Sequence, residues 1–95
     1  MKIIFEKNDL ILNEGNYYTP SFKVINEWIT VQIKTTGVST VSIESSIDGI
    51  DWFEIEGTEF DTEPTGGLQS YNESQIDLLY RIKSTLEPIS IKILL

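Results

Sequence analysis

The chain has 95 residues, which leaves room for one domain spanning residues 1–95, and a domain of this size removes only about 60–65% of its surface from water on folding. A large cofactor or a deep internal pocket is therefore not expected. Its 15 acidic and 7 basic residues give a formal charge of −8, which disfavours nucleic acids and anionic membranes as partners. The lack of cysteine excludes disulfides, thiolate metal sites and redox switches.

Alternation of apolar and polar residues runs through most of the chain and predicts β-strands. The alternation is clearest at residues 28–35, where Ile29, Val31 and Ile33 form an apolar row opposite polar neighbours. Such a row is typical of an antiparallel strand with one buried face. Weaker patterns earlier in the chain predict strands at residues 2–6, 10–12 and 22–25.

Further strands are predicted in the second half of the chain, at residues 40–46, 51–56, 78–83 and 89–95. Their inward rows are expected at Val41 and Ile43, at Leu78, Tyr80 and Ile82, and at Ile89, Ile91 and Ile93. Residues 58–74 are polar, acidic and rich in glycine, and they are expected to form a surface loop. About seven or eight short strands at this spacing predict an all-β fold, an antiparallel β-sandwich of Ig-like or jelly-roll type.

The sharpest local signal is the sequence Ser46-Ile47-Asp48-Gly49-Ile50-Asp51-Trp52, which predicts a hairpin. Asp48 can accept hydrogen bonds from backbone amides in the turn, and Gly49 can adopt a positive φ at low cost. Asp48 and Asp51 also suggest a calcium site. Calcium takes six or more oxygen ligands, however, and only these two lie close in the sequence, so no metal site is predicted.

The direction of Trp52 depends on the register of this hairpin, because a one-residue slip exchanges the two faces of a strand. Pairing Ser45 with Phe53 and Ile43 with Ile55 gives an apolar inner row and places Trp52 on the outer face. A loop of another length, or a bulge, would turn Trp52 into the core. The apolar pattern favours the first pairing, but both orientations stay open at this point.

Residues 41–55, followed by Leu79-Tyr80-Arg81-Ile82-Lys83 and Ile89-Ser90-Ile91-Lys92-Ile93, resemble small β-sandwich modules of tailed-phage virions. In such modules an S-x-D-G-x-x-W hairpin precedes a variable loop, a Y-R strand and a closing strand. The resemblance spans roughly residues 28–95 and implies an accessory structural role in a capsid, head fibre or tail. The hairpin is also similar to those of discoidin-like and sialidase-repeat carbohydrate-associated domains, although Ile50-Asp51 stands where the sialidase box has Gly and Thr.

Enzymatic activity is not expected. The chain has no histidine or cysteine and no phosphate loop, nucleophile elbow or zinc signature. A paired-carboxylate glycosidase could draw on the acids that crowd into ten positions, Glu54, Glu56, Glu59, Asp61 and Glu63. A core this small can hardly frame a sugar-sized cleft, so these acids are interpreted as a solvated face, and no catalytic residue or cofactor is predicted.

Aromatic residues outside the core are the clearest indication of function, because such residues are enriched at the centres of protein interfaces. The residues predicted to bind a partner are Tyr17, Tyr18, Trp28, Trp52 and Arg81. Trp28 falls in the polar row of its strand, but it could instead cap the end of the sandwich. For Arg81, a cross-strand ion pair is favoured over a contact with a neighbouring subunit.

Together these features predict a non-enzymatic phage virion protein, an auxiliary or decoration protein bound to the major capsid protein or another virion subunit, with homo-oligomerisation left open. The chain is expected to be made in the host cytoplasm and to reside in the virion, because it shows no signal sequence and no apolar run of the roughly 18–20 residues that span a membrane. One alternative is a carbohydrate-binding module that uses Trp28, Trp52 and the tyrosines. Another is a tail or baseplate accessory module.

Overall fold

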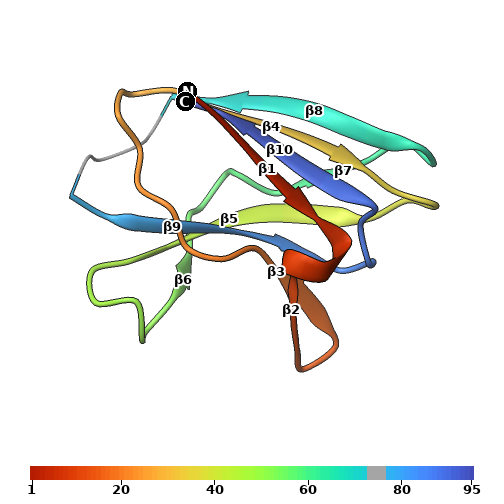
Figure 1. Cartoon of the computed structure of the whole chain (residues 1–95), viewed down its shortest axis with the longest axis horizontal. Helices are drawn as coiled ribbons and strands as arrows, with labels where there is room; N and C mark the ends of the chain where they lie inside the picture. The colour runs from red at the N-terminus through yellow and green to blue at the C-terminus, as the bar shows by residue number, and fades with distance from the viewer. Residues whose placement is uncertain (73–76) are drawn as a thin grey trace.

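The computed structural model describes residues 1–72 and 77–95, in which ten strands form two antiparallel sheets packed face to face (Figure 1). The predicted all-β sandwich is confirmed, although it has more strands than the seven or eight expected. The helical element in these residues is a single 3₁₀ turn, η1, at Lys7–Asp9.

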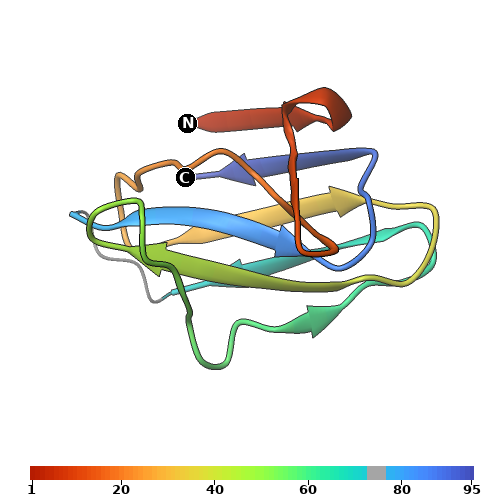
Figure 2. The ribbon, with the colours of Figure 1, turned by 90° about the horizontal axis from the view of Figure 1, so that it is seen from below.

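One sheet has four strands in the order β1-β10-β4-β8. Figure 2 shows β1 at the edge of this sheet, beside β10. The strands span Lys2–Glu6 (β1), Ser90–Leu94 (β10), Ile29–Lys34 (β4) and Gly66–Tyr71 (β8). The two chain ends meet at one corner, where the amino group of Met1 donates to the carbonyl of Leu95 at 2.9 Å.

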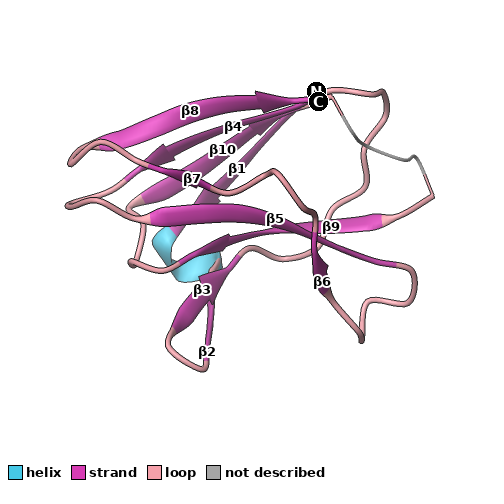
Figure 3. Ribbon diagram, turned by 180° about the vertical axis from the view of Figure 1, so that it is seen from behind, coloured by secondary structure: helices cyan, strands magenta, loops and turns pink. Residues whose placement is uncertain are grey.

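The other sheet has six strands, of which five follow the order β2-β3-β9-β5-β6 and β7 also pairs with β5. The strands span Ile11–Asn13 (β2), Asn16–Tyr18 (β3), Leu79–Ser84 (β9), Thr40–Ser46 (β5), Phe53–Glu54 (β6) and Phe60–Asp61 (β7). Because β9 covers one edge of β5, β6 and β7 share the other edge, with β6 at its end and β7 at its start. Figure 3 shows the β2–β3 hairpin and β6 on the side away from β8.

The core forms where the apolar rows of the two sheets face each other. Its buried members are Phe22, Val24, Ile29, Val31, Ile33, Val41, Ile43, Tyr80, Ile82, Ile91, Ile93 and Leu95. The inward rows predicted for β4, β5 and β9 are confirmed, and Leu78 packs against this core just before β9. Ile89 differs from its prediction, because it precedes β10 and is exposed.

The surface loop predicted at residues 58–74 is wrong for most of that segment. Both β7 and β8 lie within it, and β8 pairs with β4 from Lys34 opposite Gly66 to Ile29 opposite Tyr71. Gly66 has a φ of 138°, and a Cβ there would overlap the carbonyl oxygen of Ile33. The glycine that suggests a loop therefore permits a close approach of two strands. Residues 73 and 74 of the predicted loop lie outside the described residues.

Two other predicted segments differ from the structure, and one observed strand is not among those predicted. Residues 22–25 form no strand, and Phe22 makes only an isolated bridge with Tyr80. The strand predicted at residues 51–56 is reduced to β6. Strand β3 is absent from the predicted strands, because it directly follows the turn at Glu14 and Gly15, where both residues have positive φ.

Candidate functional site

The β5–β6 hairpin turns around Asp48. Its Oδ1 accepts hydrogen bonds from the N–H groups of Ile50 at 2.9 Å and Asp51 at 3.1 Å, and from the hydroxyl of Ser46 at 3.0 Å. The Ser46 hydroxyl oxygen accepts a further bond from the N–H of Gly49 at 2.8 Å, and Gly49 has a φ of 76°. The N–H groups of Ile50 and Asp51, and then the Ser46 hydroxyl, stabilise the carboxylate and lower the pKa of Asp48. The turn chemistry predicted for Asp48 and Gly49 is confirmed.

The register of the hairpin places Trp52 on the outer face of the six-stranded sheet. Ser45 pairs with Phe53, and the N–H of Ile55 donates to the carbonyl of Ile43 at 2.9 Å. This is the register that the apolar pattern favours. Since Ile43 points into the core and neighbouring strand residues point to opposite faces, Trp52 points outward, and its inward alternative is excluded.

Four side chains on this outer face form a cluster, here called the brace: Tyr18, Glu44, Trp52 and Arg81. Arg81 lies directly opposite Glu44, and its Nη2 and Nε lie 2.6 and 2.7 Å from Oε1 of Glu44. The guanidinium carbon lies 4.1 Å from the centroid of the Tyr18 ring and 4.4 Å from that of the Trp52 ring. The Trp52 indole N–H also donates to the carbonyl of Gly49 at 3.2 Å. The cation is therefore held by a carboxylate and two aromatic rings.

The brace ties β3 and β9 to the β5–β6 hairpin. Tyr18 comes from β3, Arg81 from β9 and Glu44 from β5, while Trp52 immediately precedes β6. The Arg81 and Glu44 side chains are only 21% and 11% exposed, and each cation–π contact contributes about 0.5–1 kcal/mol at exposed sites and about 2 when desolvated. The cross-strand ion pair predicted for Arg81 is confirmed, and the contacts of its side chain stabilise the hairpin.

The structure brings together only part of the predicted binding set. Tyr18, Trp52 and Arg81 meet in the brace, and Tyr18 is buried there. Tyr17 pairs with Ser84, whose side chain points into the sandwich, so the two neighbouring tyrosines lie on opposite faces. Trp28 is 52% exposed and lies just before β4, in the other sheet. A single aromatic platform made of all four rings is therefore absent.

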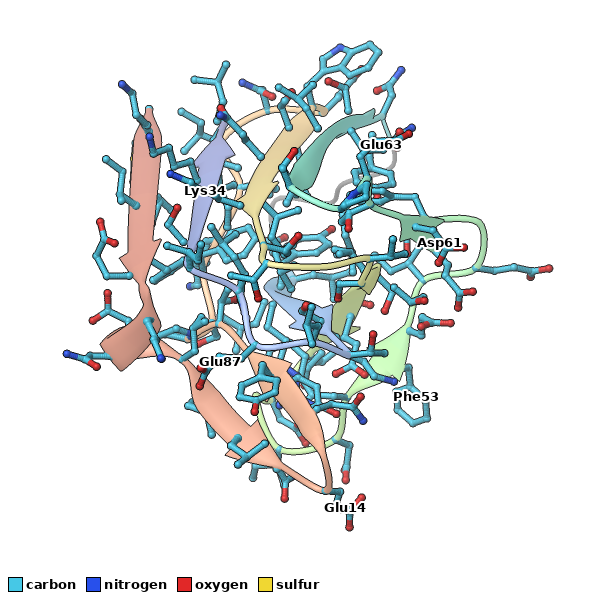
Figure 4. The ribbon with its side chains drawn as sticks, turned by 90° about the vertical axis from the view of Figure 1, so that its right-hand side faces the viewer. Glu14, Lys34, Phe53, Asp61, Glu63 and Glu87 are labelled. Atoms are coloured by element: carbon cyan, nitrogen blue, oxygen red, sulfur yellow. The ribbon has the colours of Figure 1, made fainter. Side chains whose placement is uncertain are left out.

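Sequence reasoning missed the three apolar side chains of the hairpin tip, which are Ile47, Ile50 and Phe53. They are 86%, 79% and 72% exposed. Figure 4 shows Phe53 projecting from the molecule, and Ile47, Phe53 and Leu78 help line a cavity of about 420 Å³ at the base of the tip. A signal was present in the sequence, because Ile47 and Ile50 flank the Asp-Gly turn, from which a side chain does not reach the core.

Acidic groups surround the hairpin tip. Asp48 and Asp51 lie in the turn and Glu54 follows Phe53, and all three acids are exposed. Within residues 1–72 and 77–95, no group of three or more histidine, cysteine, aspartate or glutamate side chains is placed to hold a metal ion. The chemistry that the tip offers is apolar contact bordered by negative charge.

Comparison of the chain with protein-family models, with curated proteins and with solved structures found no match. In the described part of the chain, no helix has the length and apolar character that crossing a membrane requires. The resemblance to phage virion modules stays a prediction.

Proposed function

We propose that the chain is a non-catalytic structural module that docks onto a larger protein assembly through its hairpin tip. The observation that carries the proposal is the exposure of Ile47, Ile50 and Phe53 at the end of one hairpin, the first two in the turn and Phe53 at the start of β6. Single exposed apolar residues are ordinary on protein surfaces, whereas several gathered in one place mark interaction sites. Large apolar and aromatic anchors contribute most of the binding free energy of a protein interface.

The brace supports the proposal because it orders the tip before a partner binds. Asp48 fixes the turn with three hydrogen bonds, and Arg81 packs against Trp52, the residue before Phe53. Ordering a loop on binding costs free energy, and a turn whose backbone is already ordered avoids that cost. The tip is therefore suited to enter an apolar pocket without rearrangement.

The partner that fits is a protein with an apolar pocket bordered by basic residues. The acids around the tip, Asp48, Asp51 and Glu54, are complementary to such a border, and charges at the rim of an interface chiefly raise the association rate. The resemblance to tailed-phage virion modules supports the major capsid protein, or another virion subunit, as that partner. The proposed role is decoration of the capsid shell, with the chain residing in the virion.

Two alternatives make different use of the same surface. A tail or baseplate module would dock through the same tip, so it is separated from a capsid protein only by the particle that it binds. A carbohydrate-binding module is favoured by one observation, the 52% exposure of Trp28, which leaves a ring available for stacking on a sugar. Trp52 is a weaker stacking surface, because Arg81 lies 4.4 Å from its ring centroid.

Co-sedimentation with purified heads and tails of the phage that encodes the chain tests the proposal. Wild-type chain should sediment with heads, and the double variant Ile50→Ser, Phe53→Ser should bind at least about tenfold more weakly, which corresponds to about 1.4 kcal/mol. Leu12→Ser is the matched control, because Leu12 is an equally apolar, exposed residue on β2.

The outcomes separate the candidate functions. Sedimentation with tails alone would replace capsid decoration by the tail alternative. Binding to neither particle, together with Trp28-dependent binding to a glycan array, would replace docking by carbohydrate binding. Equal binding by the tip variant and the wild type would show that the hairpin tip is not the docking surface.

A further inference from the structure

The outer face of the four-stranded sheet is basic and apolar, although the chain as a whole is acidic. One row of paired residues crosses this face as Ile4, Lys92, Gln32 and Leu68, and the adjacent row crosses it as Lys2, Leu94, Thr30 and Ser70. The apolar members Ile4, Leu68 and Leu94 are between 49% and 62% exposed. A cavity of about 260 Å³ lies between the rows, lined by both lysines together with Leu68 and Leu94.

The charge of this face is opposite to that of the chain. Lys2, Lys34 and Lys92 point outward from its strands, and Glu6 is the one acidic residue at an outward position of the four described strands. The face is therefore net positive on a chain whose formal charge is −8. The name basic face is used here for Lys2, Lys34 and Lys92 with Ile4, Leu68 and Leu94.

The opposite charge lies along the segment that passes β6 and β7 of the other sheet and ends beside β8, where Glu63 forms a bridge with Gly66. This acidic edge consists of Glu54, Glu56, Glu59, Asp61 and Glu63, all of them exposed. Figure 4 shows Lys34 toward β10 and Asp61 on the other side of the view. One molecule thus presents two surfaces of opposite charge, which adjoin at Glu63 because Gly66 also pairs with Lys34 of the basic face.

We propose that the basic face binds the acidic edge of a second copy of this chain. The lysines around the apolar cavity can pair with the carboxylates of the acidic edge. The apolar residues of the basic face add hydrophobic contact, which charge pairs alone do not provide. Because the two surfaces differ, the contact is heterologous and each copy keeps one free surface, so copies add head to tail. This inference does not depend on Ile47, Ile50 and Phe53 of the hairpin tip, although Glu54 lies both beside the tip and in the acidic edge.

The net charge gives the association an unusual salt dependence. At about 0.01 M salt the Debye length of about 30 Å is comparable to the molecule, whose extents are 33 × 25 × 24 Å, so two whole chains of charge −8 repel each other. At about 0.1 M salt the Debye length is about 10 Å, and only the complementary charges at the contact act. At about 1 M salt these are screened too. Association should therefore be strongest at intermediate salt.

The test is analytical ultracentrifugation of two charge-reversed variants, alone and mixed. Lys2→Glu with Lys92→Glu reverses the basic face, and Glu59→Lys with Glu63→Lys reverses part of the acidic edge. Each variant alone should associate at least about tenfold more weakly than the wild type, because like charges then meet at the contact. An equimolar mixture should regain association, because it pairs the unchanged face of one variant with the unchanged edge of the other.

The edge variant gives the sharpest discrimination. Each Glu→Lys change adds two positive charges, so two changes bring the formal charge from −8 to −4. A mechanism governed by net charge would then make this variant associate more strongly, whereas the proposal requires weaker association. Lys23→Glu, at an exposed lysine outside both surfaces, should associate as the wild type does.

Three outcomes would overturn the inference: a wild-type chain that stays monomeric at every salt concentration, an edge variant that associates as the wild type does, or a mixture that stays monomeric. Circular dichroism of each variant establishes that it is folded, and the salt series on the wild type is decisive even without the variants. Particle binding by the same variants is measured separately. Loss of self-association with intact particle binding, or the reverse, shows which of the two proposals fails.

Discussion

Replacing Arg81 with methionine removes the cation at the centre of the brace while keeping an unbranched apolar side chain in place of the arginine stem. The substitution removes the ion pair with Glu44 and the stacking contacts with Tyr18 and Trp52. It also leaves the Glu44 carboxylate, only 11% exposed, without its charged partner. Removing one member of a largely buried ion pair destabilises a protein because the remaining charge is poorly solvated.

The size of the effect can be worked out from these contacts. Two cation–π contacts contribute about 0.5–1 kcal/mol each, and hydrogen bonds to a charged group contribute about 1.5–3 kcal/mol. Because Arg81 is still 21% exposed, solvent screens part of these cation–π and hydrogen-bond contributions. We therefore expect a loss of about 3 kcal/mol in the free energy of unfolding. In a domain of this size, such a loss lowers the melting temperature by roughly 12–24 °C.

Urea denaturation, followed by tryptophan fluorescence and circular dichroism, measures the free energy of unfolding. Lys83→Met is the matched control, because Lys83 is the next outward residue of β9 and lies opposite Ser42 and Tyr18. It should change the free energy of unfolding by less than about 0.5 kcal/mol.

A double-mutant cycle with Glu44→Gln then isolates the ion pair from the stacking. The coupling free energy between the two sites should be at least about 1 kcal/mol. A loss below about 1 kcal/mol for Arg81→Met, or additive effects in the cycle, would refute the argument that the brace stabilises the hairpin.

Two further predictions concern the glycine in β8 and the turn. Gly66→Ala should lower the free energy of unfolding by about 3 kcal/mol, because the new Cβ overlaps the Ile33 carbonyl at a φ of 138°. Gly57→Ala, at a φ of 84° with no atom within 4 Å of the added Cβ, should cost only about 1 kcal/mol, and equal losses would contradict the steric account. Asp48→Asn keeps an acceptor oxygen but removes the charge. Since the pKa of Asp48 is lowered from 3.8 in the folded state, its stabilising effect is present above that value and is lost as the pH falls through the folded pKa. The melting-temperature difference between wild type and Asp48→Asn should therefore shrink from about pH 7 to about pH 2.5, and a constant difference would exclude the carboxylate from this role.

Residues whose role depends on local alternation could be predicted from the sequence. The row of Ile29, Val31 and Ile33 identifies β4 because a strand buries every second side chain. The pairing of Ser45 with Phe53 could be predicted because a one-residue slip would place Glu54 and Glu56 on the same face as Val41 and Ile43. Both features depend on short-range patterns and one hydrophobic core.

Features that depend on distant partners could not be predicted in this way. Strand β8 is absent from the predicted strands because Gly66 and Gly67 break the alternation, and its pairing with β4 joins residues that are 32 to 42 positions apart in the chain. An ion pair for Arg81 could be predicted, but not the two rings on either side of it, since Tyr18 approaches only once β3 pairs with β9. The exposed hairpin tip could have been found from Ile47 and Ile50 beside the Asp-Gly turn.

Site-directed photo-crosslinking shows whether the hairpin tip is the surface that docks onto the capsid. A photoreactive amino acid replaces Ile50 in one chain and Leu12 in another, and each chain is irradiated in the presence of purified phage heads. The account predicts a covalent adduct with a capsid subunit from position 50 and none from position 12. Adducts from position 12 alone, or none from either position, would contradict it.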